Sequence, residues 1–171
     1  MTVVIFLTVA LIIASINDIQ FQKIPNWLTY PAMSVGIAYH TWMKGLEGFI
    51  FSVEGLGVGL AVLIIPYLMG GMGAGDIKLM GVVGGFLGPK EVFMAFLFTG
   101  IVGGIYALVI LTLSGNLKLT VKRYWAMLKL LILTRNIMYI PPSAKEMKPR
   151  LCYGLAITIG TLLSLFRGSL I

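Results

Sequence analysis

The sequence predicts an all-α integral membrane protein with six transmembrane helices and one long cytoplasmic amphipathic loop. Of its 171 residues, 58% are hydrophobic and only 11% are charged, whereas about a quarter of the residues in a soluble domain are charged. The mean hydropathy is +0.98, and the apolar residues gather in runs near the roughly 20 residues that a membrane-spanning helix needs. Because no polar stretch is long enough for a separate soluble domain, residues 1–171 are expected to form one membrane-embedded domain.

Six apolar runs are the candidate spans, and short hinges such as Lys44–Glu47 separate most of them. The first run lacks a basic region before it and a small-residue cleavage site, so we interpret it as a retained span and not as a signal peptide. The fourth run is short and follows a glycine-rich stretch that we expect at the interface, where non-helical backbone must be buried in protein or line a watery cavity. The expected spans are residues 2–17, 26–43, 48–69, 77–89, 91–113 and 149–166.

The distribution of lysine and arginine predicts the orientation of the spans, because cytoplasmic loops are enriched in both residues. Six spans place the two termini on one side of the membrane, and that side holds only Lys44, Lys90 and Arg167. The opposite side holds ten basic residues, so we expect it to face the cytoplasm and both termini to lie outside. These ten are Lys23, Lys78, Lys118, Lys122, Arg123, Lys129, Arg135, Lys145, Lys148 and Arg150.

The segment 114–148 is the only long connection, and it mixes apolar and basic residues. Side chains such as Leu117, Val121 and Trp125 alternate with lysines and arginines, a pattern typical of an amphipathic helix on the inner leaflet. A seventh, weakly hydrophobic span is the alternative. The net charge of +7 is then explained by topology and by contact with anionic inner-leaflet lipids, and no nucleic acid partner is expected.

Glycines recur at helical spacing within several of the expected spans. Small residues four positions apart allow two helix backbones to approach closely in lipid. We therefore interpret these glycines as packing residues and not as ligand-binding ones. They are Gly55, Gly57 and Gly59, the pairs Gly81/Gly85 and Gly84/Gly88, and the pair Gly100/Gly104.

Two aspartates, Asp18 and Asp76, lie at the ends of strongly apolar stretches in a chain with only six acidic residues. Ionisable groups at the edge of the hydrocarbon layer are costly and are functional candidates by default. The orientation above places both on the cytoplasmic face, where they can share one site. Two close carboxylates that share a proton can activate water and protonate an amide nitrogen, as peptide hydrolysis requires.

Other interpretations of the pair stay open at the level of residue patterns alone. Asp76 is well placed to be the N-cap of the fourth span, and a small transporter or ion-conducting protein could use both acids to bind cations or protons. The backbone of Gly73-Ala74-Gly75 fits the proteolytic interpretation, because glycines permit close approach and an extended substrate segment could lie against it. A single cysteine, Cys152, and a single histidine, His40, provide no plausible metal cluster, and no cofactor is expected.

The motifs around the aspartates resemble those of the type IV prepilin peptidase family. The matching residues are Asp18, the run Lys23-Ile24-Pro25-Asn26, the G-x-G-D motif Gly73-Ala74-Gly75-Asp76, and Lys78. The resemblance implies an intramembrane aspartic protease with a six-span core, in which Asp18 and Asp76 are catalytic. It implies that Gly73, Gly75, Lys23, Pro25, Asn26 and Lys78 bind substrate or support the motif. The implied substrate is a prepilin or pseudopilin precursor, whose short basic leader is removed at the cytoplasmic face of the cell membrane.

Two departures from the family pattern narrow the expected activity. Many bacterial members carry an additional region with paired Cys-x-x-Cys motifs and methylate the new N-terminus, whereas this chain has one cysteine. We therefore expect peptidase activity alone, as in the small members that serve Flp/Tad-type pili or archaeal preflagellins. The last span reads Pro149-Arg150-Leu151-Cys152-Tyr153-Gly154, where many relatives have Pro-Tyr-Gly-Pro, and we assign Cys152 to packing. Glu54 is expected to lie outside the site, and Lys23 and Lys78 could lower the pKa values of the aspartates or extend toward lipid headgroups.

Overall fold

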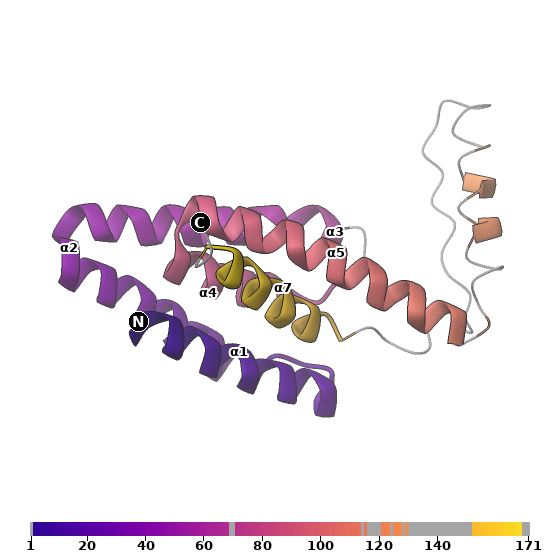
Figure 1. The fold of residues 1–171 in the computed structure, drawn as a ribbon, viewed down its shortest axis with the longest axis horizontal. Helices are drawn as coiled ribbons and strands as arrows, with labels where there is room; N and C mark the ends of the chain where they lie inside the picture. The colour runs from indigo at the N-terminus through magenta and orange to yellow at the C-terminus, as the bar shows by residue number, and fades with distance from the viewer. Residues whose placement is uncertain are drawn as a thin grey trace. The chain divides into compact units, whose positions relative to one another are not determined.

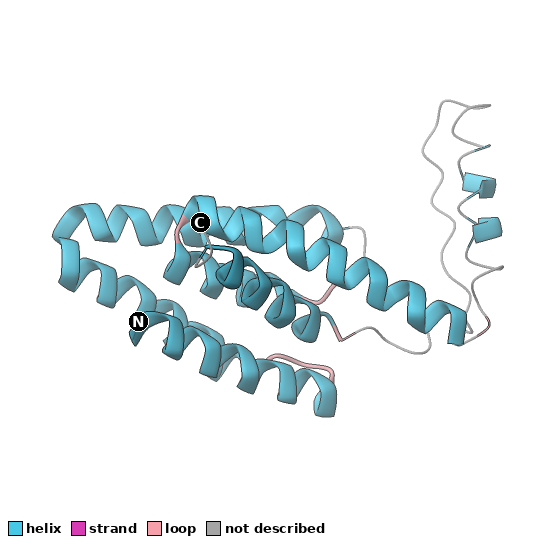
Figure 2. Ribbon diagram, viewed as in Figure 1, coloured by secondary structure: helices cyan, strands magenta, loops and turns pink. Residues whose placement is uncertain are grey.

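The computed structural model describes residues 2–68, 71–113, 115, 121–123, 125–127, 129 and 152–168, and its regular structure within these ranges is helical throughout (Figure 2). The all-α prediction is confirmed for this part of the chain. The helices are α1 (Thr2–Phe21), α2 (Asn26–Val62), α3 (Ile64–Leu68), α4 (Ala74–Leu87), α5 (Pro89–Leu113) and α7 (Tyr153–Gly168), as labelled in Figure 1.

Three of the described helical stretches are long and apolar enough to cross a membrane: Val3–Phe21, Asn26–Leu68 and Pro89–Leu113. Helix α4 has only 14 residues. At about 1.5 Å per residue it is roughly 21 Å long, less than the roughly 30 Å hydrocarbon core. The fourth apolar run is thus short, as predicted, and the total of six spans stays a prediction.

Helix α2 reverses direction at Gly45, inside the hinge that we predicted at Lys44–Glu47. Gly45 has φ 60° and ψ −135°, a conformation that only glycine adopts readily. Figure 1 shows the two halves of α2 folded back on each other as a helical hairpin. Gly36 from the first half and Ser52 from the second both lie against Gly85 of α4. The two predicted runs 26–43 and 48–69 therefore correspond to the two halves of α2, with α3 completing the second.

Helix α4 packs closely against the second half of α2 through glycines. A Cβ atom added to Gly55 would collide with the carbonyl oxygen of Gly84, and one added to Gly84 would collide with that of Gly55. One turn further, Gly59 approaches Met80 in the same way, and the hydroxyl of Ser52 donates a 2.6 Å hydrogen bond to the Gly85 carbonyl. Close packing is thus confirmed between these helices.

Three other glycines have no such close neighbour among the described residues. A Cβ atom added to Gly57, Gly100 or Gly104 would meet no described atom within 4 Å. Gly57 lies on the exposed side of α2, between two glycines that do contact α4. Helical periodicity explains this difference, because residues two positions apart on a helix face in different directions.

Helices α1, α4 and α7 contact one another and supply most of the apolar core. Leu7, Leu11 and Ala14 of α1 are fully buried, as are Met80 and Val83 of α4. The beginning of α5 joins this group, since Gly160 of α7 lies against Thr99. These elements form one compact unit, residues 1–103 with 152–171, and residues 104–151 form a second.

The predicted amphipathic segment 114–148 belongs to the second unit and lies largely outside the described residues. Its described positions 121–123, 125–127 and 129 are helical. The lipid contact proposed for it stays a prediction, as does the single-domain organisation.

Candidate active site

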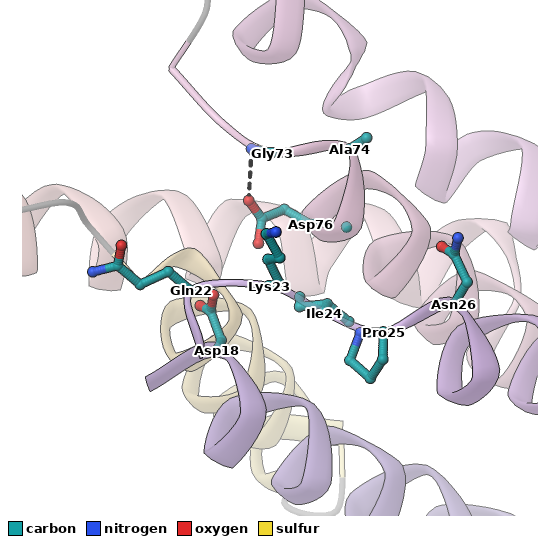
Figure 3. Close-up of a pocket in the computed structure, with 10 residues that line it drawn as sticks. Asp18, Gln22, Lys23, Ile24, Pro25, Asn26, Gly73, Ala74 and Asp76 are labelled. Atoms are coloured by element: carbon teal, nitrogen blue, oxygen red, sulfur yellow. Dashed lines mark hydrogen bonds between the residues drawn. The ribbon is translucent and has the colours of Figure 1, made fainter. Parts of the chain in front are cut away.

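The first unit contains a cavity of about 420 Å³ at the point where α1 ends and α4 begins. Both aspartates line it, although they come from different helices (Figure 3). The connection between α1 and α2 forms another wall, and the glycine-rich turn before α4 completes the lining. The lining residues are Asp18, Gln22, Lys23, Ile24, Pro25, Asn26, Gly73, Ala74, Gly75 and Asp76.

Asp76 lies in the first turn of α4, which is not one of the three membrane-length stretches. The structure makes Gly73 the N-cap, so the expectation that Asp76 is the N-cap is wrong, and Asp76 occupies the third helical position. The backbone N–H of Gly73 donates to Oδ2 of Asp76 over 2.9 Å, and the N–H of Asp76 donates to the Gly73 carbonyl over 3.1 Å. This reciprocal pair fixes the carboxylate at the start of the helix.

The environment of Asp76 favours its protonated form. Its side chain is only 8% exposed, and burial is the largest cause that raises its pKa from 3.8 to about 6. The hydrogen bond from Gly73 acts in the opposite direction, and the negative charge of Asp18 raises the pKa further. Asp18 has this effect because both carboxylates line the same cavity.

Asp18 lies within the last turn of α1, because this helix continues to Phe21, beyond the predicted end at residue 17. Its side chain is 7% exposed. The backbone N–H of Gly154, at the beginning of α7, donates to Oδ2 of Asp18 over 2.8 Å. A Cβ atom on residue 154 would be only 2.9 Å from that oxygen, so the close contact requires glycine.

The two carboxylates are therefore bound in a similar way. Each accepts one backbone N–H at a helix N-terminus through Oδ2, where N–H groups are free and the helix dipole favours negative charge. Within the described residues, no hydrogen bond reaches Oδ1 of either aspartate. One oxygen of each group is thus held by the fold, and the other is left for a ligand.

The Lys-Ile-Pro-Asn run and the G-x-G-D motif contact each other directly. A Cβ atom on Gly75 would approach Cβ of Ile24 to 2.9 Å, so this glycine allows the two segments to lie together. Pro25 caps α2 in an extended conformation, with φ −73° and ψ 142°. The Lys78 ammonium donates a 2.8 Å hydrogen bond to Oδ1 of Asn26.

Lys78 thus joins the start of α2 to α4, and its ammonium also lies 4.9 Å from the centre of the Tyr30 ring. Both contacts keep it with α2 and not with a carboxylate. Lys23 is exposed and lines the cavity. The hydrogen bond with Asn26 therefore explains the position of Lys78 better than an electrostatic effect on the aspartates does.

The structure adds Gln22 and Gly154 to the residues that the sequence singled out for the site. Gln22 lines the cavity and has φ 52°, in the left-handed region that usually holds glycine at the end of a helix. No local pattern marks a glutamine for that position, and Gly154 is 136 residues from the aspartate that it binds.

Glu54 is exposed and does not line the cavity. His40 bonds to the Phe86 carbonyl over 2.9 Å, which is a packing role.

Comparisons with known proteins identify the family of this chain. A model of the Type IV leader peptidase family matches residues 5–108, a range that includes both aspartates. A "Prepilin leader peptidase/N-methyltransferase" from Bacillus subtilis (strain 168) is 37% identical over 113 residues, which are 60% of this chain and 42% of the relative. The chain thus spans less than half the length of this relative. No solved structure matches. Since the family model covers more than half of the chain, the chain belongs to the type IV leader peptidase family.

Proposed function

We propose that the chain is an aspartic endopeptidase that removes the short basic leader from type IV prepilin-like precursors at the cytoplasmic face of the cell membrane. The observation that carries the proposal is the shared cavity: Asp18 and Asp76 both line it, and each keeps one oxygen free of hydrogen bonds within the described residues. Paired carboxylates in different protonation states are the chemistry of aspartic proteases. The family and the name of the Bacillus subtilis relative support the prepilin substrate.

In the proposed reaction the two aspartates have different roles. Asp76 holds the shared proton, because its pKa of about 6 is well above the ordinary 3.8. Ionised Asp18 removes a proton from water, and the resulting hydroxide adds to the carbonyl carbon of the scissile peptide bond. Asp76 then gives its proton to the amide nitrogen as the C–N bond breaks. The products are a new carboxylate and a new amino terminus.

The cavity also suits an extended substrate segment. Lys23 and Ile24 lie between α1 and α2 in non-helical backbone, and their N–H and C=O groups form no backbone hydrogen bond with other described residues. Gly73, another lining residue, is extended with φ −86° and ψ 156°. A peptide in extended conformation can pair with such a free edge through its own main chain, which would place its scissile bond beside the aspartates.

The proposal covers the peptidase step. The Bacillus subtilis relative is named both peptidase and N-methyltransferase. For this chain we propose peptidase activity alone, as in the small members that serve Flp/Tad-type pili or archaeal preflagellins. We further propose that both termini lie outside and that the basic residues contact anionic inner-leaflet lipids.

Replacing Asp18 tests the proposal. With the chain in liposomes and a prepilin as substrate, Asp18→Asn is expected to lower the cleavage rate by about 10³-fold or more, because the amide cannot act as a base. Cleavage is measured by gel mobility and by sequencing the new N-terminus. Glu54→Gln is the control, since it also removes one carboxylate but at an exposed position outside the cavity. Wild-type cleavage by Asp18→Asn would refute the catalytic role of Asp18, whereas a wild-type protein that cleaves no prepilin would refute the peptidase function and favour the transport alternative.

The pH dependence of cleavage follows from the raised pKa of Asp76. Its proton is retained below pH of about 6 and lost above it. Because Asp76 must donate that proton, kcat is expected to fall as the pH rises from 6 to 8, by about tenfold for each unit above the pKa. The measurement is kcat for prepilin cleavage between pH 5 and 8. A kcat that increases steadily over this range would show that Asp76 acts in its ionised form.

A further inference from the structure

The two aspartates depend on different parts of the fold for their position. Asp76 is bound by Gly73, three residues away in the same turn, so it keeps its place as long as α4 begins at Ala74. Asp18 is bound by Gly154, which belongs to another helix at the far end of the chain. Its position therefore depends on how α7 packs against α1.

A row of buried polar contacts sets that packing. The Ser15 and Thr158 hydroxyls are 2.7 Å apart, and each side chain is only 6% exposed. The Thr158 hydroxyl also lies 3.1 Å from the Leu11 carbonyl and 2.9 Å from the Gly154 carbonyl, and the Ser15 hydroxyl lies 3.3 Å from the Gly154 carbonyl. Figure 1 shows α7 alongside α1 in this unit.

These contacts follow the helical repeat of both helices. Leu11, Ser15 and Asp18 lie on one face of α1, at spacings of four and three residues, and Gly154 and Thr158 are four apart on α7. A rotation or shift of α7 that removed the Gly154 N–H from Asp18 would break the hydroxyl contacts one turn away. Buried hydroxyls left without partners are costly, so the row opposes such a shift.

We propose that Gly154, Thr158 and Ser15 are positioning residues, which use the N-terminus of α7 to fix Oδ2 of Asp18 and so direct its other oxygen to the reaction. The inference rests on the proposed peptidase function. Gly154 supplies the N–H donor and the absence of a side chain, while Thr158 and Ser15 fix the register. A purely structural role for the same residues predicts reduced stability without a specific loss of turnover.

Helix α7 offers a matched control for Thr158. Thr161 is also buried, at 0% exposure, and its Oγ1 has no hydrogen-bond partner within the described residues. Thr161→Val therefore removes a hydroxyl of the same type from the same helix without breaking a bond to α1. Removal of an unpartnered buried hydroxyl is close to neutral.

The experiment measures kcat and KM for prepilin cleavage in liposomes, together with the melting temperature, for the wild type, Thr158→Val, Thr161→Val and Ser15→Ala. A small displacement of a catalytic group can cost about 100-fold in rate, so we expect Thr158→Val to lower kcat by about 10- to 100-fold with KM changed less than about twofold. Thr161→Val should keep the wild-type kcat. Ser15→Ala should also lower kcat. In the double variant, the fold-loss of kcat should be smaller than the product of the two separate fold-losses, because the two hydroxyls are partners.

Gly154→Ala adds a direct test, since the new methyl group would be 2.9 Å from Oδ2 of Asp18. It should lower kcat at least as much as Thr158→Val. Wild-type kcat in both Thr158→Val and Ser15→Ala, or equal losses in Thr158→Val and Thr161→Val, would overturn the positioning role. The wild type and Asp18→Asn distinguish this from failure of the proposed function. If the wild type cleaves no prepilin, the peptidase assignment is wrong, and if Asp18→Asn still cleaves, the catalytic role of Asp18 is wrong. If Asp18→Asn is inactive while Thr158→Val turns over normally, only the positioning role is wrong.

Discussion

Asp76→Asn is expected to stabilise the protein at neutral pH while it abolishes cleavage. Burial disfavours the ionised form of Asp76 and raises its pKa from 3.8 to about 6. The folded state therefore binds this proton more tightly than the unfolded state, and the free energy of unfolding falls as the pH rises between these two values. Above pH of about 6 the folded protein carries a buried charge, at a cost of about 3 kcal/mol by linkage.

Asparagine removes this cost because it is neutral at every pH, and its side-chain oxygen can still accept the hydrogen bond from Gly73. We expect Asp76→Asn to raise the melting temperature in detergent at pH 7.5 and to leave it nearly unchanged at pH 4. Cleavage should fall by about 10³-fold or more, because the variant has no proton to donate. A stabilised but inactive variant is the usual sign that a residue is kept for function.

Glu54→Gln is again the matched control. Glu54 is exposed, so its neutralisation should change neither the melting temperature nor cleavage. An Asp76→Asn variant that is destabilised at pH 7.5 would show that the charge of Asp76 is favourable in the folded state, which contradicts the assignment of Asp76 as the proton donor.

Gly55→Ala is expected to disrupt the packing of α2 on α4. The added methyl group would collide with the Gly84 carbonyl and lie 2.7 Å from Cα of Gly88, and both are backbone atoms that cannot rotate away. Overpacking of a core typically costs 1–3 kcal/mol, and we expect about 3 kcal/mol or more here because two helices must separate. Since α4 carries Asp76, cleavage should fall as well.

Gly57→Ala provides the comparison, because the same substitution on the same helix would meet no described atom within 4 Å. Alanine has a better helix propensity than glycine by about 1 kcal/mol, so this variant should be as stable as the wild type or more so. Melting temperatures and cleavage rates of the two variants in the same detergent are the measurement. Equal effects at both positions would contradict the close contact between α2 and α4.

Local sequence signals predicted much of this structure. Runs of apolar residues defined the helices, and Gly45 lies inside the hinge expected at Lys44–Glu47. The charge distribution and the motifs predicted that Asp18 and Asp76 share a site, and both line one cavity. The predictions of the helices and of the hinge are confirmed because hydrophobic length and turn residues act over a few residues.

Contacts between distant segments could not be predicted in the same way. The bond from Gly154 to Asp18 depends on the rotation of α7 about its axis, and a strongly apolar sequence leaves that rotation poorly specified. The same reason explains Gly57: glycine spacing indicates possible close approach, but only the neighbouring helix decides which glycines face it. The sequence predicts Asp76 in the first turn of this helix, which is correct, but at the N-cap, which is wrong. Gly73 serves as the N-cap without a side chain, and Asp76 is the third helical residue.

The 2.8 Å bond between Lys78 and Asn26 has a mechanical consequence for the site. Together with the glycine contacts and the Ser52 hydroxyl, it braces α2 and α4 into one pair of helices, while the Ser15 and Thr158 hydroxyls brace α1 and α7 into another. Within the described residues, no side-chain hydrogen bond crosses from one pair to the other. The two aspartates thus belong to separately braced pairs of helices, and apolar side chains of both pairs share one core among the described residues. The short connection from Gln22 to Pro25 is a covalent link between the two pairs, so the distance between the carboxylates depends on this segment and on apolar packing.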